Sequence, residues 1–229
     1  MITVDRVSKS FRMKGGAQSV LRDLSFEVPA GSHFGILGGK GSGKSTILKL
    51  IGGLDHPDKG KVRCQGTVSW PFGQMRFERS MSARQNIRFL CRILGERDHD
   101  RVYHELRELT GFDAQFSLPV ERMKAMEQRM LTCALSLVFD FDITLLDGRP
   151  VFQTFDNAEA FQARFAEQMK RSTVVATADD PAKLLRSCRY FLVLDGLSGR
   201  MYDKRSEAIE AFRAINNIPA PEGDDGNDG

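Results

Sequence analysis

Residues 34–46 read FGILGGKGSGKST, and this stretch decides the fold. The apolar run at 34–37 is typical of a buried strand. The next eight residues, 38–45, match the pattern GxxxxGKS in full. Residues 46–51 then place apolar side chains at helical spacing before a pair of glycines, which is a common way for a helix to end. The sequence therefore predicts a strand, a glycine-rich loop and a helix in direct succession.

The loop at 38–45 is expected to bind a phosphate group. Glycines let backbone N–H groups turn toward phosphate oxygens, and the following helix directs its positive end at them. Lys44 is expected to reach the β- and γ-phosphates of ATP, and the Ser45 hydroxyl to bind Mg²⁺. A chance glycine-rich turn that carries a lysine is the alternative, and the flanking strand and helix argue against it. The residues expected to contact the nucleotide here are Gly38, Gly39, Lys40, Gly41, Ser42, Gly43, Lys44, Ser45 and Thr46.

A second candidate for the metal site ends another apolar run. Residues 143–147 read ITLLD, which predicts a core strand that ends in the carboxylate of Asp147. Proteins with such a phosphate-binding loop hold Mg²⁺ from across the site with a carboxylate in this position. We therefore expect Asp147 to bind Mg²⁺. The alternative is an aspartate that merely caps a turn after a core strand.

The remaining pattern predicts an α/β fold with a helical insert. The chain has 229 residues, of which 41% are hydrophobic and 28% charged, so it can bury a core and is not a disordered chain. Strands are expected at 2–7, 24–28, 34–37, 143–146, 173–177 and 190–194. Helices are expected at 46–51, 83–94, 100–109, 121–138, 158–170, 181–187 and 204–216. Gly196 and Gly199 predict a hairpin after the last strand.

Composition and charge indicate where in the cell the protein is located. No apolar run approaches the roughly 20 residues that a membrane-spanning helix needs, and no secretion signal is apparent, so a cytoplasmic location is expected. The net charge is +3, but residues 220–229 carry four acidic side chains and no Lys or Arg, which leaves the rest of the chain at +7. The tail is expected to be disordered. Four scattered cysteines, Cys64, Cys91, Cys133 and Cys188, are expected to be buried reduced thiols.

This layout resembles the nucleotide-binding subunit of ABC transporters. The resemblance implies a P-loop NTPase fold with an antiparallel β subdomain and an inserted helical subdomain at about 80–140. It covers a nucleotide-binding domain over 1–218, and an acidic tail follows at 219–229. The family places an aromatic ring on the adenine at the position of Phe11, although a core role is equally compatible with this residue.

More local motifs are similar to one branch of that family. SWPFG at 69–73, RQNIRF at 84–89 and LSLVFDFD at 135–142 resemble the ATP-binding components of capsular-polysaccharide exporters. The resemblance implies a homo- or heterodimer of such subunits, attached to integral membrane permease subunits at the inner face of the cell membrane. Basic residues are not clustered with aromatic ones, so no nucleic-acid partner is expected.

The chain departs from the family pattern at four catalytic positions. Gly148 follows Asp147 where the family has a glutamate that orients the attacking water, and Ala178 stands in place of a histidine that contacts the γ-phosphate. The family's glutamine between nucleotide and membrane subunit aligns with Glu78, which is expected to bind Mg²⁺ instead. The Ser-Gly-Gly signature is replaced at 124–127 by KAME. No residue is therefore assigned a catalytic role.

These features favour an exporter subunit that binds MgATP and hydrolyses it slowly or not at all, a pseudo-ATPase. A soluble regulatory or scaffold protein that keeps ATP as a structural ligand is the main alternative. A small-molecule kinase is a weaker one, because roughly 30 residues of β pattern precede the phosphate-binding loop. A DNA-associated ABC protein is disfavoured by the absence of a basic, aromatic-rich footprint.

Overall fold

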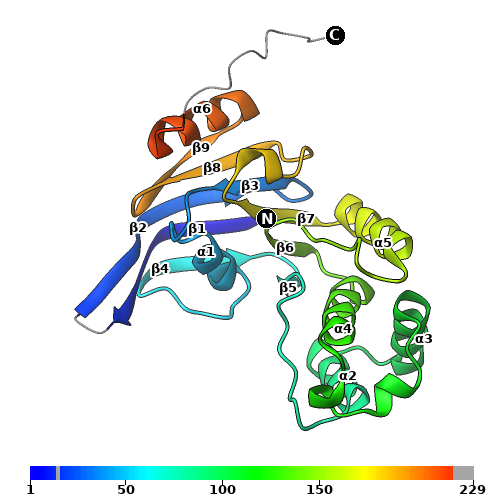
Figure 1. Ribbon diagram of the computed structural model, residues 1–229. Coiled ribbons are helices and arrows are strands. Elements are labelled where there is room, and N and C mark those ends of the chain that lie inside the picture. The colour runs from blue at the N-terminus through cyan, green and yellow to red at the C-terminus, as the bar shows by residue number, and fades with distance from the viewer. Residues whose placement is uncertain (14–15, 219–229) are drawn as a thin grey trace, which may run out of the picture.

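The computed structural model describes residues 1–13 and 16–218, whose strands form two sheets (Figure 1). A three-stranded antiparallel sheet has the order β2-β1-β4, and a six-stranded sheet has the order β5-β6-β7-β3-β8-β9. The strands are β1 (Ile2–Met13), β2 (Gly16–Val28), β3 (His33–Leu37), β4 (Lys59–Cys64), β5 (Val68–Pro71), β6 (Ile143–Asp147), β7 (Thr173–Ala178), β8 (Tyr190–Asp195) and β9 (Ser198–Tyr202). The larger sheet is parallel except for β9, which runs antiparallel to β8.

Helices cover the larger sheet and build a separate group beside it. The α-helices are α1 (Lys44–Ile51), α2 (Ala83–Leu94), α3 (His99–Thr110), α4 (Ala125–Val138), α5 (Ala158–Arg171) and α6 (Arg205–Asn216). Three short 3-10 turns are η1 (Ala114–Ser117), η2 (Val120–Arg122) and η3 (Pro181–Lys183). Figure 1 shows α2, α3 and α4 gathered below the sheet core, on the side of β5 and α5. They form the inserted helical subdomain.

The apolar core follows the alternation of side chains along the central strands. Ile36 and Leu145 point to the face that packs against α1 and the three-stranded sheet. Their neighbours Leu37 and Leu146 point to the opposite face, in one cluster with residues of α5 and α6. Because both faces are covered, β3, β6 and β7 carry almost continuous apolar runs, as central parallel strands do.

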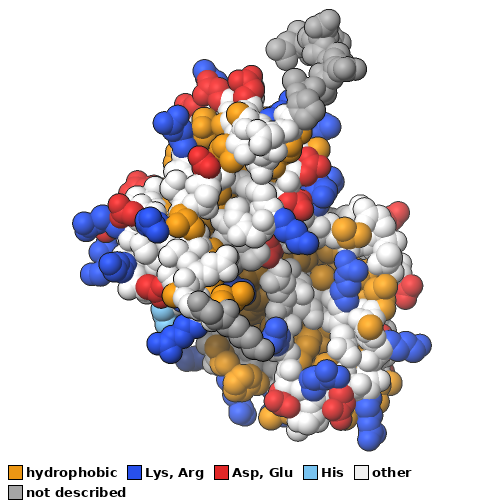
Figure 2. Space-filling view, turned by 60° about the vertical axis from the view of Figure 1, so that its left-hand side comes forward, with side chains coloured by type: hydrophobic (Ala, Val, Ile, Leu, Met, Phe, Trp, Pro, Cys, Tyr) orange, Lys and Arg blue, Asp and Glu red, His pale blue; other side chains and the backbone are white. Residues whose placement is uncertain are grey.

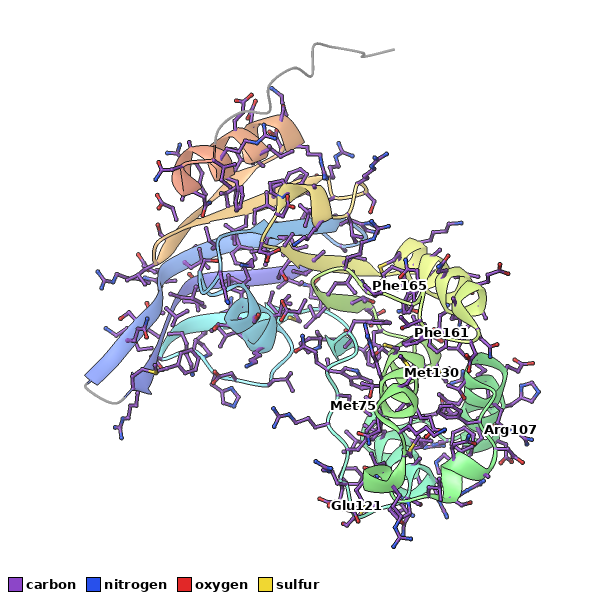
Figure 3. All side chains as sticks on the ribbon, in the orientation of Figure 1. Met75, Arg107, Glu121, Met130, Phe161 and Phe165 are labelled. Atoms are coloured by element: carbon purple, nitrogen blue, oxygen red, sulfur yellow. The ribbon has the colours of Figure 1, made fainter. Side chains whose placement is uncertain are left out.

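The helical subdomain has a core of its own. Met130 on α4 and Phe161 on α5 belong to one buried cluster, and the half-buried Phe165 and Met75 pack against it (Figure 3). The cluster lies between the three insert helices and α5, so the subdomain is anchored to the sheet through α5. Lys and Arg side chains are spread widely over the face shown in Figure 2, in keeping with the positive charge outside the tail.

The parallel register brings three chain segments to one edge of the sheet. Leu37 at the end of β3 pairs with Ala178 at the end of β7, and Thr177 pairs with Asp147 at the end of β6. The carboxyl ends of these strands therefore meet, and ligands of open α/β sheets bind at this edge. The phosphate-binding loop leaves β3 at the same place.

The expected fold class is confirmed, with its antiparallel β subdomain and helical insert. The first strands are longer than predicted, and β4 and β5 were not predicted at all. The expected hairpin around Gly196 is present as β8 and β9. The acidic tail at 219–229 lies outside the described residues, and the domain boundary at 218 stays a prediction. Within 1–13 and 16–218, no helix is long and apolar enough to span a bilayer.

Two predicted helices are corrected. Residues 181–187 form only the turn η3, because the Arg205 guanidinium takes the carbonyl oxygens of Pro181, Leu184 and Leu185 that a helix would need. The helix predicted at 121–138 begins later, at Ala125, and the turn η2 precedes it.

The cysteines are free thiols, as expected, and three of the four are buried. Cys64 is only half-buried.

Candidate nucleotide-binding site

The phosphate-binding loop, residues 38–45, joins the end of β3 to the start of α1. Gly41 and Gly43 adopt φ angles of +80° and +97°, which side-chain-bearing residues rarely reach. A Cβ added at Gly43 would lie 2.9 Å from a methyl carbon of Val20, so the loop packs closely against β2. Only glycine satisfies both the backbone angle and this contact. Around the loop, Lys40 is exposed and Thr46 is half-buried.

Lys44 is folded back onto the loop that precedes it. Its Nζ donates hydrogen bonds of 2.7 Å to the carbonyl oxygens of Gly38 and Gly39. Burial lowers the pKa of Lys44, and the negative charges of Asp179 and Asp147 oppose that shift. The ammonium thus lies within the ring of the loop, where a phosphate oxygen would replace a carbonyl as its partner.

Two further features show that the loop fits a phosphate ligand. Ser42 Oγ is buried and has no hydrogen-bond partner among the described residues. A buried hydroxyl without a partner is costly, and a ligand oxygen in the loop would satisfy it. Near Gly39, an added Cβ would lie 2.8 Å from the amide oxygen of Asn216, so the last turn of α6 closes one side of the loop.

Asp147 is held directly across from the loop. Its Oδ2 accepts hydrogen bonds from the Ser45 hydroxyl at 2.8 Å and from the Gln74 amide at 3.2 Å. Its Oδ1 accepts from the Thr177 hydroxyl at 2.8 Å. The sequence-based pairing of Ser45 with Asp147 is therefore present in the geometry.

The donor set suits Mg²⁺ rather than a metal that needs a full protein cage. Among residues 1–13 and 16–218, no group of three or more His, Cys, Asp or Glu side chains could hold a metal ion. Mg²⁺ is commonly bound by one or two protein oxygens, the phosphates of its nucleotide and several waters. Ser45 and Asp147 supply such a pair of oxygens.

Gln74 is a site residue that sequence reasoning missed. It follows the short strand β5, whose end lies beside β6, and its backbone N–H is tied to the carbonyl of Pro71. The signal that could have found it is a polar side chain just beyond a strand at the carboxyl edge of the sheet. Because β5 was not predicted as part of the sheet, Gln74 could not be assigned to that edge.

Glu78 faces another group. Its carboxylate accepts hydrogen bonds from the hydroxyl and the backbone N–H of Ser80, and these lower its pKa. Asn86 binds the backbone N–H and carbonyl of Glu78 and so fixes this turn to the start of α2. The structure thus brings Gln74, and not Glu78, to Asp147. Binding of Mg²⁺ by Glu78 stays a prediction.

Phe11 lies at the margin of the site. It is 38% exposed and pairs with Gln18 on β2, the strand that also touches the loop at Gly43. The ammonium of Lys9 lies 5.2 Å from the centre of the ring. An exposed ring beside the loop is compatible with stacking on a base, and that role stays a prediction.

The positions of the family's catalytic groups hold different chemistry. Gly148 has a φ of +83°, with no atom within 4 Å of an added Cβ, and Ala178 is buried at the end of β7. At the start of α4, the Glu127 carboxylate accepts a 2.7 Å hydrogen bond from the backbone N–H of Lys124. The N-terminal end of α4 therefore carries an acid.

Comparisons with known proteins agree with this geometry. A family model described as ABC transporter matches residues 21–182. The chain is 31% identical over 222 residues to the capsule polysaccharide export ATP-binding protein CtrD of Neisseria meningitidis serogroup B, with 96% of the chain and all of the relative covered. It is 29% identical to the ATP-binding protein BexA of Haemophilus influenzae, with 93% and 98% covered. It is also 29% identical to the polysialic acid transport ATP-binding protein KpsT of Escherichia coli, with 84% and 87% covered.

Solved structures share the fold. A dimeric ATP-binding cassette, solved with ADP and Pi after hydrolysis, superposes with a TM-score of 0.69 at 18% identity and covers 89% of this chain and 98% of its own. A putative metal-chelate type ABC transporter in an inward-facing conformation superposes with a TM-score of 0.68 at 17% identity, with 95% and 89% covered. From the phosphate-binding loop, its opposed aspartate and the match over most of its length, we conclude that this chain belongs to the ABC transporter family.

Proposed function

We propose that the chain is the ATP-binding subunit of an exporter for capsular or another cell-surface polysaccharide, and that it binds MgATP with impaired or absent hydrolysis. The loop at 38–45, with Ser45 and Asp147 opposed at 2.8 Å, is the observation that carries ATP binding. Similarity over most of the chain to a capsule polysaccharide export protein of one bacterium and a polysialic acid transport protein of another supports the choice of cargo.

Impaired hydrolysis is supported by the residues that surround the metal position. Asp147 accepts three hydrogen bonds and is followed by a glycine, so no side chain there can take a proton from an attacking water. Loss of a positioned general base typically costs a factor of roughly 10² to 10⁴ in rate. Binding and cleavage have separate structural requirements, and the residues around Asp147 support binding without supplying a general base at position 148.

The proposed partners are integral membrane permease subunits and a second ATP-binding subunit, identical or related. The chain would then be peripheral on the inner face of the cell membrane. Exposed apolar side chains on α2 support a docking surface on the helical subdomain, because Phe89 and Ile93 are 61% and 63% exposed one helical turn apart. We assign this surface to a cytoplasmic segment of the permease.

Nucleotide titration tests the proposed binding. Wild type is expected to bind MgATP, and Lys44→Ala is expected to lose most of that affinity because the phosphates lose the half-buried ammonium that lies within the loop. Thermal unfolding of both proteins checks that the variant is folded. Equal affinities for wild type and variant would remove the premise of an ATP-binding subunit.

Steady-state phosphate release tests the proposed loss of hydrolysis. We expect turnover well below about 1 s⁻¹, the lower end of ordinary enzyme rates. Lys44→Ala serves as the background for contaminating activity. Turnover of wild type at an ordinary enzyme rate above that background would show that another group activates the water.

The second candidate is a soluble regulatory or scaffold protein that holds ATP without a transporter, and the altered start of α4 favours it. Purification of the chain from detergent-solubilised membranes separates the two. An exporter subunit is expected to bring a polytopic membrane protein with it, and a Phe89→Ser/Ile93→Ser double variant is expected to release that protein. A scaffold would bring none with either chain.

A further inference from the structure

A small cavity of about 170 Å³ lies beside Asp147, on the side of the helical subdomain. Gly73, Asp147 and Gly148 line it from the edge of the sheet. Arg129 on α4 and Arg149 line it as well. Two arginines, both exposed, therefore line the same cavity as the proposed metal-binding carboxylate.

The charges in this cavity are unbalanced. Asp147 is the only carboxylate that lines it, and both of its oxygens are engaged by neutral donors of Ser45, Gln74 and Thr177. Within the described part of the chain, neither guanidinium takes part in a hydrogen bond or an ion pair. The Arg129 guanidinium lies 5.9 Å from the centre of the Phe155 ring.

Besides Asp147, no residue that lines the cavity carries a negative charge. Burial raises the pKa of the Cys133 thiol, which lines the same cavity, to about 11, so this group is neutral at physiological pH. The remaining lining residues are apolar or glycine. The two arginines exceed the single carboxylate of Asp147 in this cavity, and an anion brought by a ligand would balance the second positive charge.

The position in the chain indicates which anion. Arg149 is two residues after Asp147 and follows Gly148, where an added Cβ would meet open space. A positive charge near Asp147 would attract a nucleotide's terminal phosphate, whereas an acid would repel it. A guanidinium presents a planar fork of N–H donors that matches phosphate oxygens. Arg129 approaches from α4, so an anion held by both would join the sheet to the helical subdomain.

We propose that Arg149 and Arg129 bind the terminal phosphate of the nucleotide and make this site select ATP over ADP. The proposal rests on the proposed ATP-binding function and adds a property to it. The two arginines take the place of the missing γ-phosphate contact at Ala178. They stabilise the uncleaved triphosphate, which is consistent with a subunit that binds ATP for its structural effect.

Affinities for MgATP and MgADP test this proposal in the isolated chain. Arg149→Met is expected to lower the affinity for MgATP by roughly tenfold or more and to leave the affinity for MgADP within about twofold of wild type. The reason is that a charge-assisted hydrogen bond is lost only with the triphosphate. Arg129→Met is expected to act in the same direction. Arg149→Lys keeps the charge but not the fork and is expected to fall between wild type and Arg149→Met.

Arg63→Met is the matched control, because Arg63 is an exposed arginine on β4 outside the cavity. It removes one positive charge and is expected to leave the ratio of the two affinities unchanged. The affinity for MgADP is also measured with and without added orthophosphate, to test whether free phosphate binds where the terminal phosphate of ATP would. If orthophosphate tightens MgADP binding in wild type but not in Arg149→Met, the two phosphates share this site.

The outcomes are distinct. If Arg149→Met lowers the affinities for MgATP and MgADP equally, or lowers neither, the proposal that these arginines select ATP is wrong, while ATP binding itself stands. If wild type binds neither nucleotide, both this proposal and the proposed function are wrong. Unchanged thermal unfolding of the variants confirms that a loss of affinity is local.

Discussion

Lys44 links nucleotide binding to protonation. Burial lowers the pKa of its ammonium in the free protein, and the negative charges of a bound triphosphate would raise that pKa again. Binding therefore takes up a proton wherever the pH exceeds the lowered pKa. The affinity for MgATP is expected to be constant near neutral pH and to fall as the pH rises through the pKa of free Lys44.

Titrations between about pH 7.5 and pH 10 check this prediction, since the unperturbed lysine pKa lies near 10.4. Lys44→Arg is the control, because a guanidinium stays charged over the whole range. Its affinity is expected to be flat with pH, whatever its absolute value. An equally steep fall in both proteins would assign the effect to another group.

Asp147 makes the second prediction at this scale. Asp147→Asn keeps the size of the side chain and one acceptor oxygen, but it removes the negative charge that attracts Mg²⁺. Wild type is expected to bind ATP more tightly with Mg²⁺ than with EDTA, and the variant is expected to lose roughly tenfold or more of that gain. Nucleotide titrations under the two conditions measure it. An undiminished gain in the variant would place the metal elsewhere.

What could be predicted about single residues depended on how local their signal is. The loop at 38–45 and Asp147 were identified because neighbouring residues supply the strand and the loop that position them. Gln74 was not, because its role depends on β5, a four-residue strand whose only clear partner is β6, far along the chain. Glu78 was placed by alignment; its carboxylate accepts hydrogen bonds from Ser80, and its binding of Mg²⁺ stays a prediction.

At the scale of elements, β4 depends on one glycine. Gly60 has a φ of +83°, and an added Cβ would lie 2.3 Å from the carbonyl oxygen of Arg6 on β1. Backbone atoms cannot move aside as a flexible side chain can, so Gly60→Ala is expected to separate β4 from β1 locally. We expect a loss of about 3 kcal/mol or more in the free energy of unfolding.

Gly53→Ala is the matched control for this prediction. Gly53 has a φ of +66°, but an added Cβ there would have no neighbour within 4 Å. Gly53→Ala is expected to lower the free energy of unfolding by the backbone strain alone, about 1 kcal/mol. Urea denaturation of the three proteins compares them, and equal costs for the two substitutions would mean that the β1–β4 contact yields without strain.

The exposed face of α2 allows a prediction that separates stability from association. Phe89→Ser/Ile93→Ser is expected to leave the free energy of unfolding nearly unchanged, because both side chains are mostly in solvent. The same change is expected to lower the fraction of the chain that sediments with membranes containing the permease. Leu54→Ser, at a residue 60% exposed outside α2, is the control and is expected to keep that fraction. Equal sedimentation of all three proteins would contradict the docking surface.

Elements were predicted well where burial imposes a clear pattern. The parallel strands β3, β6, β7 and β8 carry buried apolar runs, so their pattern is visible in the sequence. β4 is an edge strand with exposed lysines, and its hydrogen bonds to β1, rather than its side chains, make it a strand. The false helix at 181–187 shows the converse, because Arg205 on α6 binds the carbonyls of that segment.

For the whole molecule, pairing of two chains around nucleotide is the property most altered. The helix α4 begins at Ala125, and the Glu127 carboxylate accepts a hydrogen bond from the N–H of the preceding Lys124, in the region where the family has a serine and two glycines. The isolated chain is therefore expected to remain a monomer when MgATP is added, since an acid at this helix end would repel a triphosphate brought by a second chain. Size-exclusion chromatography with and without MgATP checks this, and a shift to twice the mass would show that other contacts suffice.

The fold as a whole could be predicted because a phosphate-binding loop after one strand and an aspartate after another define one edge of a parallel sheet. The distances between residues on the two sides of that edge could not be predicted. They depend on how β5 meets β6 and how α4 approaches Gly148, and residues far apart in the sequence decide both.

The contact between Asn216 and Gly39 has a practical consequence. Because the last turn of α6 closes one side of the loop, anything attached just beyond it starts beside the triphosphate position. An environment-sensitive dye on a cysteine introduced at Ile218 is suited to report ATP entering and leaving.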